Sequence, residues 1–165
     1  MPNFRKMLSD RNTPCIQALV RLTETQNKTT LINWALDYSE EAILPLWLKA
    51  YPEDARPEAA IKAARDWLCG TIRLPQARVM ILACHAAARE AEGNPVAQAA
   101  ARAIGQCAST IHVPGHCLGL ALYGAVALAY DGVGTEAPWE QVEQRAAEEC
   151  RMMLESLRKI AGKTC

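Results

Sequence analysis

Two histidines four positions apart are the residues of this chain whose types and spacing most suggest chemistry. His112 and His116 occur in the segment HVPGHC, with Cys107 before them and Cys117 directly after. Imidazole and thiolate groups are common zinc ligands, but structural zinc sites usually contain short paired spacings that this segment lacks. No acidic residue lies between positions 103 and 130 to orient a ligand set. We therefore expect neither a metal ion nor another cofactor here.

A nucleophilic site would need a base and an orienting acid beside a serine or a cysteine. Ser109 precedes His112 by three residues, but no strand-turn-helix elbow presents it, and no acid is near in the sequence. The sequence also contains no phosphate-binding glycine loop. We therefore predict no catalytic residues and a protein that is not an enzyme. A helical-bundle enzyme or a metal-binding protein with a pocket of histidines and arginines is the alternative.

The elements that position these residues are predicted to be helices. Prolines suited to a first helical turn recur along the chain, and glycines stand where helices should end. Thr13 and Asn94 each precede a proline and are suited to cap a helix. Pro45 should kink or divide its helix because it has no N–H to donate. The predicted helices cover residues 13–25, 30–51, 57–69, 75–92, 95–111, 114–130 and 138–161.

The predicted fold is all-α, because no segment shows the two-residue alternation of a β-strand. We expect a single domain over residues 1–165, folded as a closed, orthogonal bundle of six to eight helices. Residues 79–88 and 117–130 are apolar or small around the whole helix axis, so these two segments should be central. The last helix should be peripheral and bury one stripe, which consists of Val142, Ala146, Cys150, Met153 and Leu157.

Charge and cysteine content limit the partners. The chain has 18 basic and 18 acidic residues, which gives no reason to expect a nucleic acid or a membrane as partner. Residues 103–130 carry no charge, but polar residues interrupt the stretch, and the remaining run of about 13 residues is typical of a core helix. The seven cysteines form no C-x-x-C pair, and no signal-like segment begins the sequence. We expect reduced thiols in a cytoplasmic protein.

Three segments, in order, resemble a known family: EDARPEAAIKAARDWLCG, QARVMILACHAAAREAEG and AAARAIGQCASTIHVPGHCLGLALYGAVAL. The chain is similar to the immunity proteins of bacterial polymorphic toxin systems, specifically to the all-helical group close to the fifth catalogued immunity type. The resemblance covers roughly residues 54–130, and its matching positions are Asp54, Arg56, Pro57, Arg65, Trp67, His85, Arg89, Arg102, His112 and His116. It implies a cytoplasmic inhibitor that binds a cognate toxin domain.

Some of the matching residues form the first candidate site, a polar centre. Its members are His85, Arg89, Arg102, His112 and His116. We expect the last two histidines to be mostly buried and hydrogen-bonded at a corner between helices. The arginines need charged partners if they are buried, and the candidate partners are Asp54, Asp66 and Glu90. We expect this centre to determine helix register rather than to bind a ligand.

The second candidate site is a contact surface for the toxin. Its members are Asp37, Glu40, Glu41, Trp47, Tyr51, Glu53 and Asp54. Acidic groups can steer a partner toward the surface, and aromatic side chains can anchor it. An oligomeric scaffold is a further alternative, for which exposed Trp47 and Trp139 would be evidence. The sequence is also compatible with a homodimer.

Overall fold

The computed structural model describes residues 4–8 and 10–163, and within these ranges it contains helices and no strand. The eight α-helices are α1 (Pro14–Glu24), α2 (Lys28–Tyr38), α3 (Leu44–Ala50), α4 (Arg56–Leu68), α5 (Leu74–Glu90), α6 (Pro95–Ser109), α7 (Ala125–Val133) and α8 (Trp139–Ala161). Two short π-helical segments are η1 (Ser39–Ile43) and η3 (Leu120–Gly124), and η2 (Pro114–Leu118) is a 3-10 helix. The prediction of an all-α single domain is confirmed.

Prolines begin most of these helices, as predicted. A proline occupies one of the first two positions of α1, α3, α4, α5 and α6, where its missing N–H would have no partner within the helix. Asn94 caps α6 as expected, because its side-chain oxygen accepts the Ala97 N–H at 3.1 Å. Thr13 does not cap α1, since its hydroxyl donates to the Asp10 carbonyl at 2.8 Å instead.

Pro45 divides the helix that was predicted over residues 30–51. The chain passes from α2 through η1 into α3, and the Leu44 N–H donates to the Ser39 carbonyl five residues back. In a regular α-helix, Pro45 would leave one carbonyl without its donor, and its ring would clash with that carbonyl. A π-turn before the proline relieves both problems without ending the helical path.

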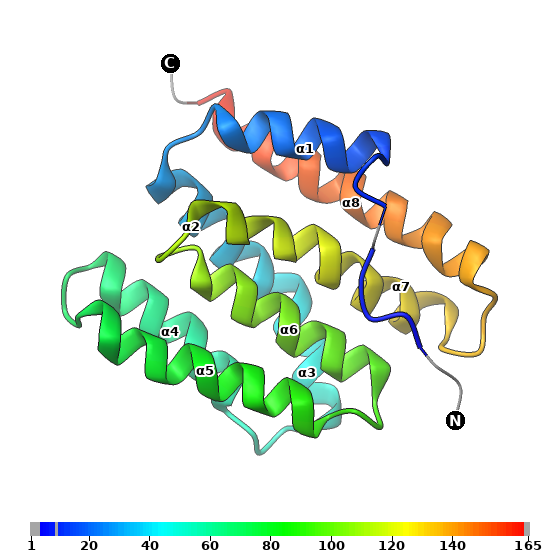
Figure 1. Cartoon of the computed structure of the whole chain (residues 1–165), viewed down its shortest axis with the longest axis horizontal. Helices are drawn as coiled ribbons and strands as arrows, with labels where there is room; N and C mark the ends of the chain where they lie inside the picture. Colours follow the sequence, from blue (N-terminus) through cyan, green and yellow to red (C-terminus); the bar gives the residue numbers. More distant parts are fainter. Residues whose placement is uncertain (1–3, 9, 164–165) are drawn as a thin grey trace.

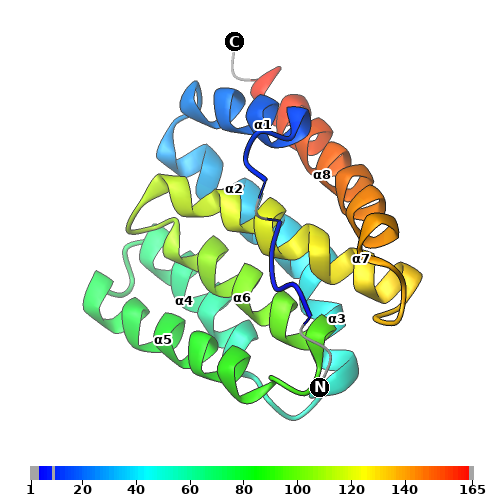
Figure 2. The ribbon, with the colours of Figure 1, turned by 45° about the vertical axis from the view of Figure 1, so that its right-hand side comes forward.

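Helix α6 lies at the centre of the fold (Figure 1). It contacts α4 and α5 on one side and α2, α3 and α7 on others. Helices α4 and α5 form an antiparallel hairpin at one end of the molecule, whereas α1 and α8 lie side by side at the other end, next to α7 (Figure 2). Helix α6 is therefore surrounded by other helices, and its middle residue, Arg102, belongs to the predicted polar centre.

The central position of α6 corrects one prediction about the core. Residues 79–88 were expected at the centre, but in α5 the residues Val79 and Leu82 are 61% and 59% exposed. The distance at which two helices pack depends on the side chains between them. In α6 the buried residues are mostly alanine, so several helices can approach it closely. Residues 117–130 are mostly buried, as predicted.

Residues 114–133 form the one stretch of the described chain that is long and apolar enough to cross a membrane. In the fold, 61% of its apolar window is buried, and the stretch packs against α6 and α8. It therefore serves as core. Helix α8 lies on the outside and buries the predicted stripe of Val142, Ala146, Cys150, Met153 and Leu157.

Candidate functional site

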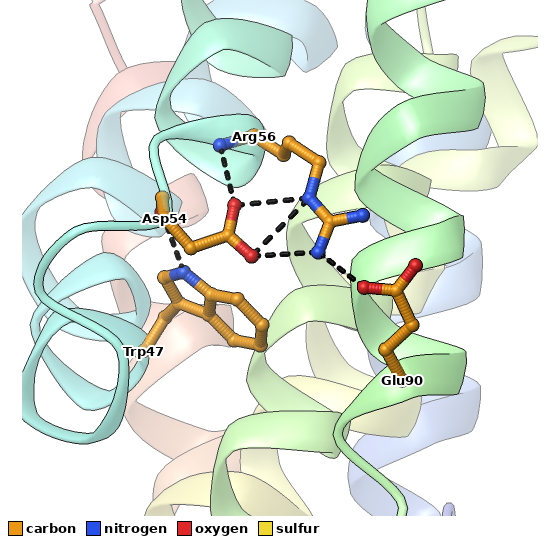
Figure 3. Close-up of polar contacts among 4 residues, drawn as sticks. All are labelled: Trp47, Asp54, Arg56 and Glu90. Carbon is orange, nitrogen blue, oxygen red and sulfur yellow. Dashed lines mark hydrogen bonds and ion pairs between the residues drawn. The ribbon is translucent and has the colours of Figure 1, made fainter.

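Arg56 connects the start of α4 with the end of α5. Its Nη2 lies 2.7 Å from Asp54 Oδ2 and 2.6 Å from Glu90 Oε2 (Figure 3). The Asp54 carboxylate also accepts the backbone N–H of Arg56 at 3.1 Å, which satisfies a donor that has no partner within the helix. The indole N–H of Trp47 donates to the Asp54 backbone carbonyl at 2.9 Å. These contacts hold the turn between α3 and α4 against α5.

The charges in this network stabilise one another. The hydrogen bond from Arg56 is the main reason that the pKa of Asp54 is lowered from its ordinary value. The same guanidinium lowers the pKa of Glu90, and the two carboxylates raise the pKa of Arg56. All three groups are therefore charged at neutral pH. Asp54, which the sequence suggested for toxin contact, has its side chain engaged within the protein.

Arg65 makes a similar connection from α4 to α2 and η1. Its Nη2 lies 2.9 Å from Asp37 Oδ1 and 2.7 Å from Glu40 Oε2. All three side chains are partly exposed, so water screens each pair, and each contributes about 1 kcal/mol or less to stability. Asp37 and Glu40 thus remain at the surface, but their charge is partly balanced.

A groove of about 400 Å³ lies beside this ion-pair cluster. Its lining residues are Glu40, Leu44, Ala55, Glu58, Ala59, Ile61, Lys62 and Arg65. Ala55 also lines a shallow hollow formed by residues 50–55, so groove and hollow adjoin. We call the groove, the hollow and Glu41, which follows the groove residue Glu40 in the sequence, the acidic face. Glu41, Glu53 and Glu58 are exposed there and have no ion-pair partner among the described residues.

Trp47, which was predicted as a surface contact, and Trp139, whose exposure would have favoured an oligomeric scaffold, are both at least partly buried. Trp47 is only 1% exposed, and its ring packs on Tyr51 with 4.6 Å between the centroids. Trp139 is half-buried, with the Arg5 guanidinium 4.7 Å from the ring centroid. The prediction of Trp47 as a surface anchor is therefore wrong. Its large apolar ring is buried because its N–H finds a partner in the Asp54 carbonyl.

Four of the five predicted members of the polar centre come from α5, α6 and η2; α6 packs against both α5 and η2, and three of the four act electrostatically on His85. The imidazole of His85 rests on Gly105, where a Cβ atom would lie only 2.5 Å from His85 Cε1. Burial lowers the pKa of His85, and electrostatic interaction with Arg89, Arg102 and His116 lowers it further. His85 is therefore mostly neutral at pH 7. We call His85, Arg89, Arg102 and His116 the basic cluster.

His112 lies outside this cluster, and the prediction that it is buried is wrong. Helix α6 ends at Ser109, and His112 is exposed in the turn that follows. The Ser109 hydroxyl donates to the Gly105 carbonyl at 2.7 Å. Because Pro114 begins a separate 3-10 segment, His112 and His116 do not share a helix face.

The carboxylates that were expected to balance the basic cluster pair with other residues. Asp54 and Glu90 bind Arg56, and Asp66 binds Lys62 with 2.6 Å between Oδ2 and Nζ. Within the part of the chain that the structure describes, neither arginine of the basic cluster has an ion-pair partner. The cluster is therefore a concentration of positive and titratable groups that form no ion pair among the described residues. The charge of Arg89 still acts on Glu90, whose pKa it helps to lower.

The cysteines are arranged as small core residues. Cys84, Cys107 and Cys117 are buried, and burial raises the pKa of each thiol to about 12. Thiols that stay protonated are weak nucleophiles and weak metal ligands. The described residues contain no group of three or more His, Cys, Asp or Glu side chains that could hold a metal ion. Cys15 and Cys150 are in contact, with 3.0 Å between their Sγ atoms.

Two residues of these sites were not expected from the sequence. Glu58 lines the acidic groove, but along the sequence it is one more charged residue on an exposed helix face. Gly105 supports the His85 ring, and the sequence contained a signal for this contact. A glycine inside an otherwise alanine-rich helix often marks the close approach of another group.

The sequence assigns the chain to a family of immunity proteins. Residues 21–156 match the family described as "Imm-5 like putative immunity protein", and the chain belongs to this family. The match confirms the resemblance of the sequence motifs and extends from within α1 to within α8. It includes the acidic face and the basic cluster. Comparison with curated proteins and with solved structures finds no match.

Proposed function

We propose that this immunity protein neutralises a cognate bacterial toxin by binding to it in the cytoplasm, without catalysing a reaction. The observation that carries the proposal is the family match over residues 21–156, which includes most of the fold. An immunity protein has a protein partner, and a rigid helical bundle offers a surface that changes little on binding. Binding of this kind needs complementary charge and a few well-packed contacts.

The acidic face is our candidate for the contact surface. Residues 37–66 contain seven acidic and four basic residues, and the groove adds apolar side chains from Leu44 and Ile61. Among the described residues, Glu41, Glu53 and Glu58 have no ion pair that a partner would have to break. These features fit a basic toxin segment that places an apolar side chain in the groove.

Co-expression tests the neutralisation itself. A toxin domain encoded beside the gene of this protein is expressed in bacteria with and without the protein. We expect growth only when both are present, and we expect the purified proteins to elute together in size-exclusion chromatography. Cell death despite soluble immunity protein would refute this pairing.

A charge-reversal variant tests the contact surface separately. Glu41→Lys, Glu53→Lys and Glu58→Lys together should slow association with the toxin about tenfold or more at low salt. The variant should remain folded, because exposed charges contribute little to stability. Circular dichroism and stopped-flow binding measure the two effects.

The matched control reverses three exposed carboxylates on α1 and α8, at the opposite end of the fold. Glu24→Lys, Glu143→Lys and Glu148→Lys change the net charge equally, so they separate a local effect from a global one. If both variants slow association by the same factor, the acidic face is not the contact surface. The neutralisation proposal then depends on co-expression alone.

A further inference from the structure

The basic cluster contains polar atoms that have no partner. The Nε of Arg102 and the Nδ1 of His116 are buried, and neither has a hydrogen-bond partner within the described residues. Buried polar groups in folded proteins are nearly always hydrogen-bonded, so each exception calls for an explanation. Both atoms belong to residues that act electrostatically on His85, so these two exceptions occur at one place. The other two such atoms of the described residues, Ser39 Oγ and Trp139 Nε1, lie outside the cluster.

The positions of the four side chains follow from the backbone. His85 and Arg89 are one turn apart on α5, so they lie on the same face of this helix. Arg102 precedes Gly105 by three residues on α6, and the missing side chain of Gly105 lets the His85 ring approach this helix. Segment η2 packs on α6 and brings His116 to the same place.

Like charges that approach one another repel, and partial removal from water further raises the free energy of the charged groups. Two other arginines of this fold are partly buried like Arg102, and each forms ion pairs with two carboxylates: Arg56 and Arg65. Cations would be repelled by the cluster. A bound anion would accept hydrogen bonds from the unpaired donors and balance the charge.

We propose that His85, Arg89, Arg102 and His116 form a binding site for an oxyanion, that is, for a phosphate or carboxylate group. The guanidinium of Arg102 is the principal donor, because its planar fork matches the oxygens of either group. His116 donates from the side of η2. Arg89 is exposed and contributes charge from the rim, and His85 lines the site next to α6. The proposal does not depend on toxin binding.

Histidine NMR signals provide a direct test, because the chain contains only three histidines and one of them is outside the site. Inorganic phosphate is added to the full-length protein at constant ionic strength. We expect saturable shifts of the His85 and His116 ring signals at about millimolar phosphate or below. The pKa of His85 should rise when phosphate is bound, because an anion opposes the effect of the neighbouring positive charges. The signals of exposed His112 should not follow the same curve.

Variants distinguish phosphate binding at a specific site from a general attraction of anions to the protein. Arg102→Gln should weaken phosphate binding about tenfold or more, since it removes a charged donor pair. If this variant does not fold, Arg89→Gln provides the same test at an exposed position, with a smaller loss expected. Arg78→Gln is the matched control on α5, where Arg78 is exposed and outside the cluster, and it should bind like the wild type.

Parallel titrations with acetate and chloride identify the anion. Stronger binding of phosphate points to a phosphate-bearing ligand, and stronger binding of acetate points to a carboxylate; either result supports the site. Chloride effects equal to those of both oxyanions would show simple charge screening and would overturn the proposal. It would also be overturned if phosphate shifted no histidine signal, or if it bound equally to the wild type and to a folded Arg102→Gln variant.

Discussion

The indole N–H of Trp47 donates to the backbone carbonyl of Asp54 across the turn between α3 and α4, at 2.9 Å. The Asp54 side chain binds Arg56, and Arg56 binds Glu90 at the end of α5. The sequence suggested both Trp47 and Asp54 as toxin contacts. In the fold they hold the start of α4 in place, so their substitution should affect stability before it affects binding.

Asp54→Ala should lower the free energy of unfolding by about 1–2 kcal/mol, because it removes a backbone contact at the helix start and a charged pair. The Asp54 side chain is 24% exposed, so water reduces part of the electrostatic effect. Urea unfolding followed by circular dichroism measures the change. Glu53→Ala is the control, and we expect a change within about 0.5 kcal/mol at this exposed position. Equal losses in the two variants would contradict the structural role of Asp54.

Acid should destabilise the wild type more steeply than Asp54→Asn. The pKa of Asp54 is lowered in the folded protein, mainly by the hydrogen bond from Arg56. Its contribution to stability is therefore complete above the unfolded pKa of about 4 and is lost as the pH falls through the lower folded pKa. Unfolding free energies measured between pH 7 and pH 3 should converge for the two proteins at the acidic end. Parallel curves would show that this carboxylate is not linked to folding.

Trp47→Phe should lower the free energy of unfolding by about 1–3 kcal/mol, because the smaller ring leaves space in the core and the Asp54 carbonyl loses its donor. Trp67→Phe is the matched control: Trp67 is half-buried, and the Lys28 Nζ lies 5.2 Å from its ring centroid. This substitution should lower the free energy of unfolding by less than about 1 kcal/mol. Thermal and urea unfolding of both variants measure the difference, and a costlier control substitution would contradict the burial of Trp47.

Gly105→Ala should move the His85 imidazole away from α6, because the new Cβ atom would lie 2.5 Å from the ring. Burial is the main cause of the lowered His85 pKa, so the pKa should rise toward the ordinary value of about 6.5 in the variant. Histidine NMR titration measures it. Gly93→Ala is the control, because nothing lies within 4 Å of a Cβ atom there.

The same change should alter the pH dependence of stability. In the wild type, the folded pKa of His85 is below its unfolded value, so stability is complete above about pH 6.5 and decreases as the pH falls toward the folded pKa. The decrease should be smaller in Gly105→Ala. An unchanged pKa together with an unchanged pH dependence would show that the helices move apart while the ring stays in place.

Mild oxidation should join Cys15 to Cys150, since their Sγ atoms are 3.0 Å apart and the residues lie on adjacent helices α1 and α8. Burial raises the pKa of Cys150, so the reaction should accelerate as the pH increases. The bond should raise the free energy of unfolding by about 2–4 kcal/mol. Peptide mapping by mass spectrometry identifies the bond, and Cys150→Ser should prevent it. Cross-links only to other cysteines would contradict the observed contact.

Much of the local structure was predictable because its causes lie within a few residues. A proline excludes certain backbone geometries around itself, and Asn94 accepts a hydrogen bond from the free N–H of Ala97 three residues further along the chain. The stripe from Val142 to Leu157 repeats at helical spacing, so α8 was expected to bury one face. The family resemblance depended on the same kind of local pattern, and the match over residues 21–156 confirmed it.

The tertiary structure decided which helices are neighbours and therefore which charges meet. Arg56 and Glu90 are 34 positions apart, and nothing along either helix specifies that they pair. Once Asp54, Asp66 and Glu90 pair with other residues, the arginines of the basic cluster are left without an ion pair among the described residues. Trp47 is buried for a similar reason, because packing brings a carbonyl within reach of its N–H. A sequence pattern shows which side chains need partners, whereas only the distances between packed helices determine which partners they obtain.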